Sequence, residues 1–116
     1  MTLAEAASSW IDSQILDGRG NDMKVVKPAA GYASCPDHTI KKDLLEMIPE
    51  GEKLGISLTE SYAMVPEASI CGMIFIHPQA SYPDIRSISV QQFESYLQRR
   101  GLSAEEGHRF LGYLLK

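Results

Sequence analysis

Side chains that could take part in chemistry lie close together in the segment KPAAGYASCPDH, residues 27–38. Tyr32, Cys35, Asp37 and His38 supply a phenol, a thiol, a carboxylate and an imidazole. Prolines and a glycine interrupt the segment, which therefore predicts a loop rather than a helix or a strand. Such a loop has three interpretations: a metal site, a thiol nucleophile, or a backbone surface shaped to hold a small molecule.

The metal interpretation rests on Cys35 and His38, because thiolate and imidazole are good zinc ligands. A closed zinc site needs further ligands, and Cys71, His77 and His108 show no paired spacing that would supply them. We therefore predict that no structural metal is bound.

The nucleophile interpretation has no stronger support, because a catalytic thiol and its base usually come from distant segments. In a purely structural interpretation, Asp37 caps the helix that follows and Cys35 packs as a small apolar residue. That interpretation leaves Gly31 and Tyr32 unexplained. We assign no catalytic residue.

The chain has 116 residues, 44% of them hydrophobic, and a net charge of −4. This length predicts one module over 1–116, with an N-terminal helix and turn in 1–22 and the core in 23–116. The acidic balance argues against nucleic acid, and no apolar run reaches membrane-spanning length. We therefore expect a cytoplasmic protein in which Cys35 and Cys71 are reduced.

Helical periodicity and capping signals define the N-terminal half. The stretch Thr2–Glu5 is a capping-box pattern, and the apolar spacing behind it predicts a helix over 3–16 with Trp10 as its core anchor. The β-branched stretch 24–26 predicts a strand, and residues 40–48 predict a second helix.

Alternation of apolar and polar residues marks the second half. It predicts extended segments at 56–58 and 69–77, with a returning strand at 85–90. Ser89 and Ser103 are positioned to cap two final helices. The expected fold class is α+β, a curved antiparallel sheet of about three to five strands with helices packed on one side.

Three segments in order, 27–39, 58–69 and 72–82, resemble the C-terminal activation domain of cobalamin-dependent methionine synthase. The stretch 96–103 is similar to that family's penultimate helix and its glycine stop. The resemblance covers the chain from about Val26 to the C-terminus.

The resemblance implies a function. The family domain binds S-adenosylmethionine and delivers its methyl group to the cobalt of an inactivated corrinoid, with an electron from a flavodoxin-type protein. The expected partner is thus a corrinoid-binding protein or methionine synthase fragment that carries the cobalamin. The chain is not expected to be catalytic alone.

The resemblance also implies a site. The family signature, a basic residue followed by small residues and Gly-Tyr, corresponds here to Lys27, Ala29, Gly31 and Tyr32, and Tyr82 belongs to the same pocket. Lysine would hold the ligand carboxylate, and the small residues would expose backbone groups to the nucleoside. Tyrosine rings can face the adenine or the sulfonium.

This chain departs from the family in two respects. Lys27 replaces an arginine, and lysine cannot make a planar bidentate contact with a carboxylate. The longer family domain also supplies an acidic residue for the ligand's amino group from its N-terminal portion, and Asp12, Asp17 or Asp22 are the candidates here.

The chain is accordingly interpreted as a truncated, stand-alone homologue. We expect an apolar surface near Trp10 that is covered in a homodimer or by the corrinoid protein. The alternative is a docking module for a corrinoid protein that no longer binds S-adenosylmethionine.

Overall fold

The computed structural model describes residues 2–16 and 22–116. The elements follow one another as α1 (Leu3–Leu16), β1 (Lys24–Val26), α2 (Ile40–Glu46), α3 (Glu50–Lys53), β2 (Ser57–Leu58), β3 (Met64–Val65), β4 (Phe75–His77), α4 (Val90–Arg100), α5 (Ala104–Leu111) and a short 3₁₀ turn (Gly112–Leu114). The helices at both ends of the chain and the strand at 24–26 confirm the sequence predictions. The turn predicted over residues 17–21 lies outside the described residues.

Helix ends are fixed by the capping residues that the sequence indicated. At the start of α1, the Thr2 N–H donates to the Glu5 carboxylate at 2.8 Å and the Glu5 N–H donates to the Thr2 hydroxyl at 3.1 Å. At the start of α4, Ser89 and Gln92 form the same reciprocal box. Helix α4 ends at Gly101, whose φ of 68° lies in the left-handed region that glycine tolerates.

All strand pairing in the two described sheets is antiparallel, which confirms the α+β class. Strand β1 pairs with β4, with Lys24 opposite His77 and Val26 opposite Phe75. Strand β2 pairs with β3, with Ser57 opposite Val65. The strands therefore form two two-stranded sheets rather than one continuous curved sheet.

Two strand predictions need correction. Within the segment predicted as a strand over 69–77, only Phe75–His77 pairs. The segment 85–90 forms no strand, because Ile85 and Ile88 pack against the C-terminal helices, and its one bridge is a parallel contact between Ile88 and Leu115. The alternation of apolar residues in 85–90 thus correctly indicated which side chains are buried, but not whether the segment pairs with another strand.

The main hydrophobic core lies between α4 and α5. It consists of the buried side chains of Phe93, Leu97, Leu111 and Leu114. The N-terminal half has less cover, and Trp10 is 65% exposed. Trp10 is therefore not a buried core anchor, and its exposure agrees with the alternative expectation of an open apolar surface near Trp10.

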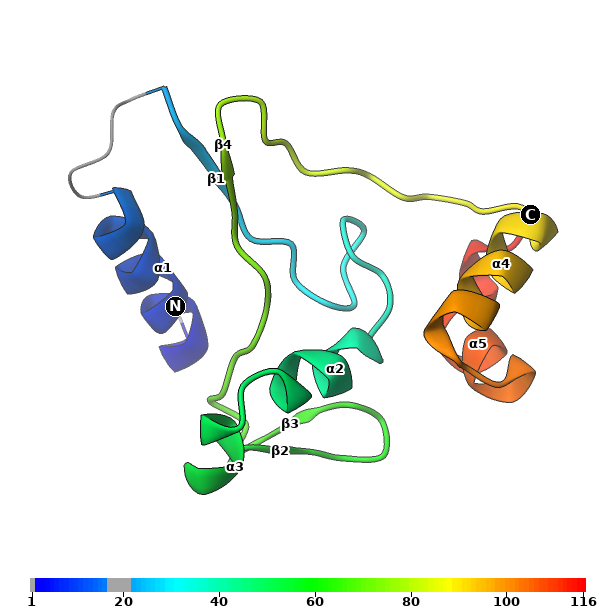
Figure 1. Cartoon of the computed structure of the whole chain (residues 1–116), viewed down its shortest axis with the longest axis horizontal. Coiled ribbons are helices and arrows are strands. Elements are labelled where there is room, and N and C mark those ends of the chain that lie inside the picture. Colours follow the sequence, from blue (N-terminus) through cyan, green and yellow to red (C-terminus); the bar gives the residue numbers. More distant parts are fainter. Residues whose placement is uncertain (1, 17–21) are drawn as a thin grey trace.

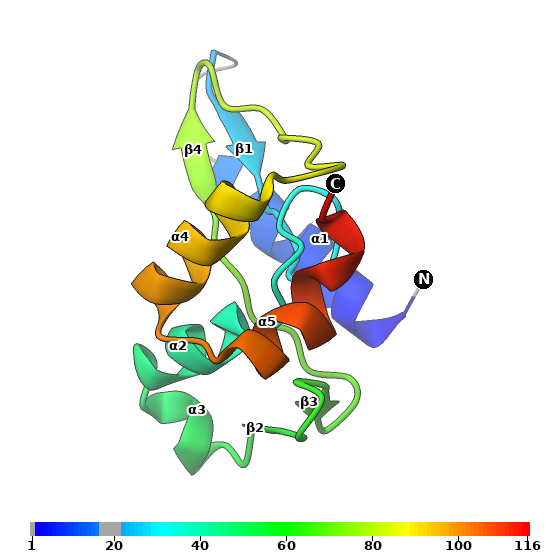
Figure 2. The ribbon, with the colours of Figure 1, turned by 90° about the vertical axis from the view of Figure 1, so that its right-hand side faces the viewer.

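The elements are spread out rather than stacked in layers. Helix α1 lies beside the β1–β4 pair at one end of the long axis, and α4 with α5 lies at the other, with the loop after β1 between them (Figure 1). In the perpendicular view, α2 and α3 lie below that loop with the β2–β3 pair (Figure 2). No helix in the described ranges is long and apolar enough to cross a membrane.

The dimensions agree with this open arrangement. The radius of gyration is 15.8 Å, whereas a compact domain of this length has about 13 Å. The accessible surface is 8177 Å², whereas a compact monomer of this mass exposes about 6,300 Å². Much of the apolar surface therefore remains uncovered.

Candidate functional site

A cleft of about 750 Å³ opens between α1 and the loop that follows β1. We refer to it as the signature cleft, because it contains most of the predicted signature. The start of α2, strand β3 and the segment 69–71 complete its walls. Its lining residues are Thr2, Ala4, Glu5, Ser8, Ser9, Lys27, Ala29, Ala30, Tyr32, Ser34, Lys41, Met64, Ser69, Ile70 and Cys71.

Lys27, the predicted carboxylate-binding residue, lies in this cleft and fastens α1 to the loop. Its ammonium donates to the Ser8 carbonyl at 3.0 Å, to the Ser8 hydroxyl at 2.5 Å and to Asp12 Oδ2 at 2.7 Å. A lysine ammonium has three N–H donors, so all of them are used within the chain. Any further partner must displace one of these contacts.

Asp12, one of the predicted acidic candidates, lies beside the cleft through its ion pair with Lys27, although it is not one of the residues that line the cleft. Its Oδ2 pairs with Lys27, whereas its Oδ1 is buried without a hydrogen-bond partner among the described residues. A buried, unpaired carboxylate oxygen is costly, and a ligand donor at this position would satisfy it. Asp17 lies outside the described residues, and Asp22 is exposed and does not line the cleft.

Tyr82 reaches the signature from the opposite side. Its hydroxyl accepts a hydrogen bond from the Lys27 backbone N–H at 2.8 Å, and the side chain is 54% exposed. Tyr82 lines a neighbouring cavity of about 600 Å³ with Pro28, Phe75 and His77, not the signature cleft. The structure thus places Tyr82 in contact with residues 27–38, which we call the signature loop, but on the face of that loop opposite the cleft.

Gly31 and Tyr32 have different surroundings. Tyr32 lines the cleft with a side chain that is 70% exposed. Gly31 has a φ of 94° and does not line the cleft; a Cβ at this position would lie 2.1 Å from His38 Cε1. The close approach that requires glycine is therefore to the imidazole of the same loop, and the contact of Gly31 with a ligand stays a prediction.

The thiols and imidazoles do not gather. Among residues 2–16 and 22–116, no group of three or more His, Cys, Asp or Glu side chains is placed to hold a metal ion. Both cysteines are free. Burial raises the pKa of the Cys35 thiol and of the Cys71 thiol above the ordinary value, which opposes thiolate formation and nucleophilic use.

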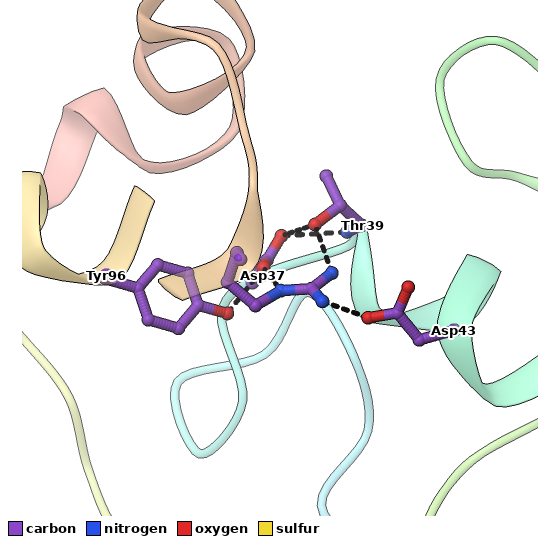
Figure 3. A network of polar contacts seen from close by, with 5 residues as sticks. Asp37, Thr39, Asp43 and Tyr96 are labelled. Carbon is purple, nitrogen blue, oxygen red and sulfur yellow. Dashed lines mark hydrogen bonds and ion pairs between the residues drawn. The ribbon is translucent and has the colours of Figure 1, made fainter. Parts of the chain in front are cut away.

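Asp37 is the centre of a buried polar network that joins the signature loop to α4 (Figure 3). Its Oδ1 accepts hydrogen bonds from the backbone N–H and the hydroxyl of Thr39, at 2.8 and 2.7 Å. Its Oδ2 accepts from the Tyr96 hydroxyl at 2.5 Å and lies 3.5 Å from Arg100 Nε. Arg100 also pairs with Asp43 of α2.

This network corrects the prediction that Asp37 caps the second helix. Thr39 occupies the N-cap position of α2, and its side chain makes no capping hydrogen bond. Asp37 instead satisfies the Thr39 N–H just before the helix. Tyr96 and Arg100 share a helical face through their i,i+4 spacing, a signal that could have indicated a common partner.

Sequence reasoning also missed Lys41, which lines the cleft from α2. The Lys41 ammonium donates to the Tyr62 carbonyl at 2.9 Å and contacts His38 Nδ1 at 3.2 Å. Adjacent lysines, here Lys41 and Lys42, are usually a solvated pair. Only the fold shows that one of them is partly buried beside the signature loop.

Comparison with known proteins agrees with this architecture. The family model for the activation domain of vitamin B12-dependent methionine synthase matches residues 16–101. This chain belongs to that family. The match includes the signature loop, the Asp37 network and α4, and therefore every lining residue of the cleft except those that residues 2–9 contribute.

A solved structure extends the likeness. The crystal structure of the MetH reactivation domain bound to AdoHcy superposes with a TM-score of 0.84 at 31% sequence identity. The match covers 97% of this chain and 39% of that chain. This activation-domain homologue therefore spans well under half the length of that relative while retaining its fold.

Proposed function

We propose that this chain binds S-adenosylmethionine in the signature cleft and assists the reductive methylation of a corrinoid in a cobalamin-dependent methionine synthase system. The observation that carries the proposal is the placement of Lys27, Ala29 and Tyr32 around one cleft in a member of the activation-domain family. The structural relative supports it, because that domain was solved in complex with AdoHcy, the demethylated form of the proposed ligand.

The charges of the cleft suit the amino-acid end of such a ligand. S-adenosylmethionine carries an ammonium and a carboxylate on one carbon, and recognition of both requires an anion and a cation close together. Asp12 has a buried Oδ1 without a partner among the described residues, but it does not line the cleft, so an ammonium would reach it only after a local rearrangement. Two lysines, Lys27 and Lys41, line the cleft as candidates for the carboxylate, and the donors of Lys27 are already occupied.

The other walls suit the nucleoside. Ala29 is exposed in the cleft and presents backbone rather than a bulky side chain. The open ring of Tyr32 can stack on a base or face the sulfonium. Tyr82, held by the Lys27 backbone N–H, supports the loop from behind, and we propose that it closes the binding region from that side.

In this function the chain positions reactants rather than supplying reactive groups. The methyl group would pass from the sulfonium to the corrinoid of a partner protein, with an electron from a flavodoxin-type protein. The raised thiol pKa values of Cys35 and Cys71 agree with this division of roles, because neither cysteine is activated for attack.

The corrinoid-carrying protein is the partner that we propose for the open surface. Exposed apolar side chains lie on several elements, and the excess of accessible surface over a compact monomer indicates a face that another protein covers. Leu3 and Trp10 on α1 are 71% and 65% exposed, which makes α1 the first place to test for contact.

Isothermal titration calorimetry with S-adenosylmethionine and S-adenosylhomocysteine tests the proposal. Ala29→Trp should fill the cleft and abolish binding of both ligands. Ala68→Trp is the matched control, because Ala68 is exposed and does not line the cleft. If Ala29→Trp binds the ligands as tightly as Ala68→Trp does, the ligand does not occupy the signature cleft.

A docking module without ligand is the second candidate, and one observation favours it. Lys27 has all three donors occupied by Ser8 and Asp12, as expected for a structural lysine. Two results together would establish this alternative: the chain shows no heat of binding with roughly millimolar ligand, and it captures a corrinoid protein. A dissociation constant in that range corresponds to a binding free energy of only about −4 kcal/mol.

A further inference from the structure

Lys41 is a second cation of the signature cleft, and its surroundings differ from those of Lys27. Its ammonium makes two polar contacts, to the Tyr62 carbonyl at 2.9 Å and to His38 Nδ1 at 3.2 Å. No ion pair between Lys41 and a carboxylate is present in the described part of the chain. Since an ammonium has three donors, one N–H of Lys41 has no partner among the described residues.

The two contacts hold Lys41 in place without neutralising it. The Lys41 ammonium can only donate, so His38 Nδ1 must accept and its proton must lie on Nε2. Burial and the charge of Lys41 lower the His38 pKa, which keeps the imidazole neutral at physiological pH. A partly buried cation held by two neutral acceptors retains its full charge for a third partner.

The backbone that supplies one of these acceptors is itself unusual. Tyr62 has a φ of 64°, and among the described residues it is the one non-glycine residue with a positive φ. Its ring packs edge-on against Phe110 at 5.2 Å between centroids, which helps to hold this conformation. A side chain makes such a conformation unfavourable, and backbone strain of this kind concentrates at functional sites.

Lys27 is the poorer candidate for an incoming anion. All three of its donors are already bound, and a ligand would have to displace Ser8 or separate the ion pair with Asp12. Lys41 can accept a carboxylate oxygen without breaking any contact. The two lysines line the same cleft, so a ligand there can reach either of them.

We infer that Lys41, rather than the signature lysine, holds the carboxylate of the amino-acid ligand. This inference rests on the proposed function and assigns the carboxylate contact within the same cleft. Lys27 is then a positioning residue that joins α1 to the loop.

The test compares two ligands that differ only in the carboxylate: S-adenosylmethionine and decarboxylated S-adenosylmethionine. Calorimetry is performed on the wild-type chain, Lys41→Met and Lys27→Met, with Lys42→Met as the control. Lys42 has the same charge, lies next to Lys41 on α2, and is exposed outside the cleft. Thermal melts of each variant verify that it is folded.

Lys41→Met should weaken binding of S-adenosylmethionine by roughly ten- to a hundredfold, the contribution of a charge-assisted hydrogen bond. Its affinity for the decarboxylated ligand should change by less than about threefold. Lys27→Met should weaken binding of both ligands to the same degree, because it loosens α1, which forms one wall of the cleft. Lys42→Met should bind both ligands as the wild type does.

The inference is overturned if Lys27→Met, and not Lys41→Met, shows the carboxylate-selective loss. It is also overturned if Lys41→Met binds S-adenosylmethionine like the wild type, an outcome that leaves the proposed function intact. A wild-type chain that binds neither ligand overturns both. Should Lys41→Met fail to fold, Lys41→Gln removes the charge with a polar side chain of similar reach and must show the same carboxylate-selective loss.

Discussion

Removing one hydroxyl, with Tyr96→Phe, tests whether the buried network fastens the C-terminal helices to the signature loop. The Tyr96 hydroxyl donates to Asp37 Oδ2 at 2.5 Å, and the Asp37 side chain is only 5% exposed. A hydrogen bond to a charged group contributes about 1.5–3 kcal/mol. Asp37 keeps its contacts with Thr39 and Arg100 in the variant, so the loss should stay below the about 3–5 kcal/mol of a fully uncompensated buried charge.

The assay is urea denaturation, with the free energy of unfolding compared between variants. We expect Tyr96→Phe to lower it by about 1.5–3 kcal/mol, and Tyr113→Phe, at a side chain that is 68% exposed, to change it by less than about 0.5 kcal/mol. A double-mutant cycle with Asp37→Asn should give a coupling energy above about 0.5 kcal/mol. Additive effects, or a Tyr96→Phe variant as stable as the wild type, would refute the network.

The same residue gives a dependence on pH. Burial, followed by the hydrogen bond to Asp37, raises the Tyr96 pKa well above its ordinary value. The unfolded chain therefore loses the tyrosine proton at a lower pH than the folded chain. The contribution of Tyr96 to stability is complete below about pH 10 and should decline as the pH rises above that value, a loss absent from Tyr96→Phe.

Two further perturbations concern the loop itself. Burial lowers the pKa of His38, so the unfolded chain binds a proton at this imidazole at a higher pH than the folded chain does. The free energy of unfolding should therefore fall as the pH drops below about 6.5 in the wild type and in His77→Gln, but not in His38→Gln. Equal pH profiles for all three proteins would contradict this prediction. Gly31→Ala should lower the free energy of unfolding by about 1–3 kcal/mol, because the new Cβ would meet the His38 ring and the φ of this residue is 94°. Gly72→Ala, which has open space around it, should leave the free energy of unfolding nearly unchanged. A Gly31→Ala variant as stable as the wild type would show that the loop does not approach the imidazole in this way.

Local signals predicted the helices and their ends well, because capping is decided within a few residues. The reciprocal contacts of Thr2 with Glu5 and the left-handed φ of Gly101 depend only on neighbours in sequence. Strand pairing was less predictable, since Ile85 and Ile88 alternate like a strand but are buried against helices. A period of two residues reports which side chains face a core, not whether the backbone finds a partner.

The candidate site was predictable in part. The small residues around Ala29 identified the loop, and the structure places that loop in the wall of a cleft. The sequence did not reveal that Gly31 is required by His38, that Lys27 is occupied by α1, or that Lys41 lacks an anionic partner in the described ranges. Each of these facts depends on contacts between segments, and no local pattern reports them.

The attachment of α1 connects the architecture to the proposed function. Among the described residues, the hydrogen bonds that join α1 to the rest of the chain all come from the Lys27 ammonium. Trp10, which could have anchored the helix through apolar burial, faces solvent. One wall of the signature cleft is thus held largely by polar contacts that water and salt can weaken. A ligand that contacts both the α1 wall and Lys41 on α2 would bind only the arrangement in which that wall is in place, so binding and docking of α1 must favour each other.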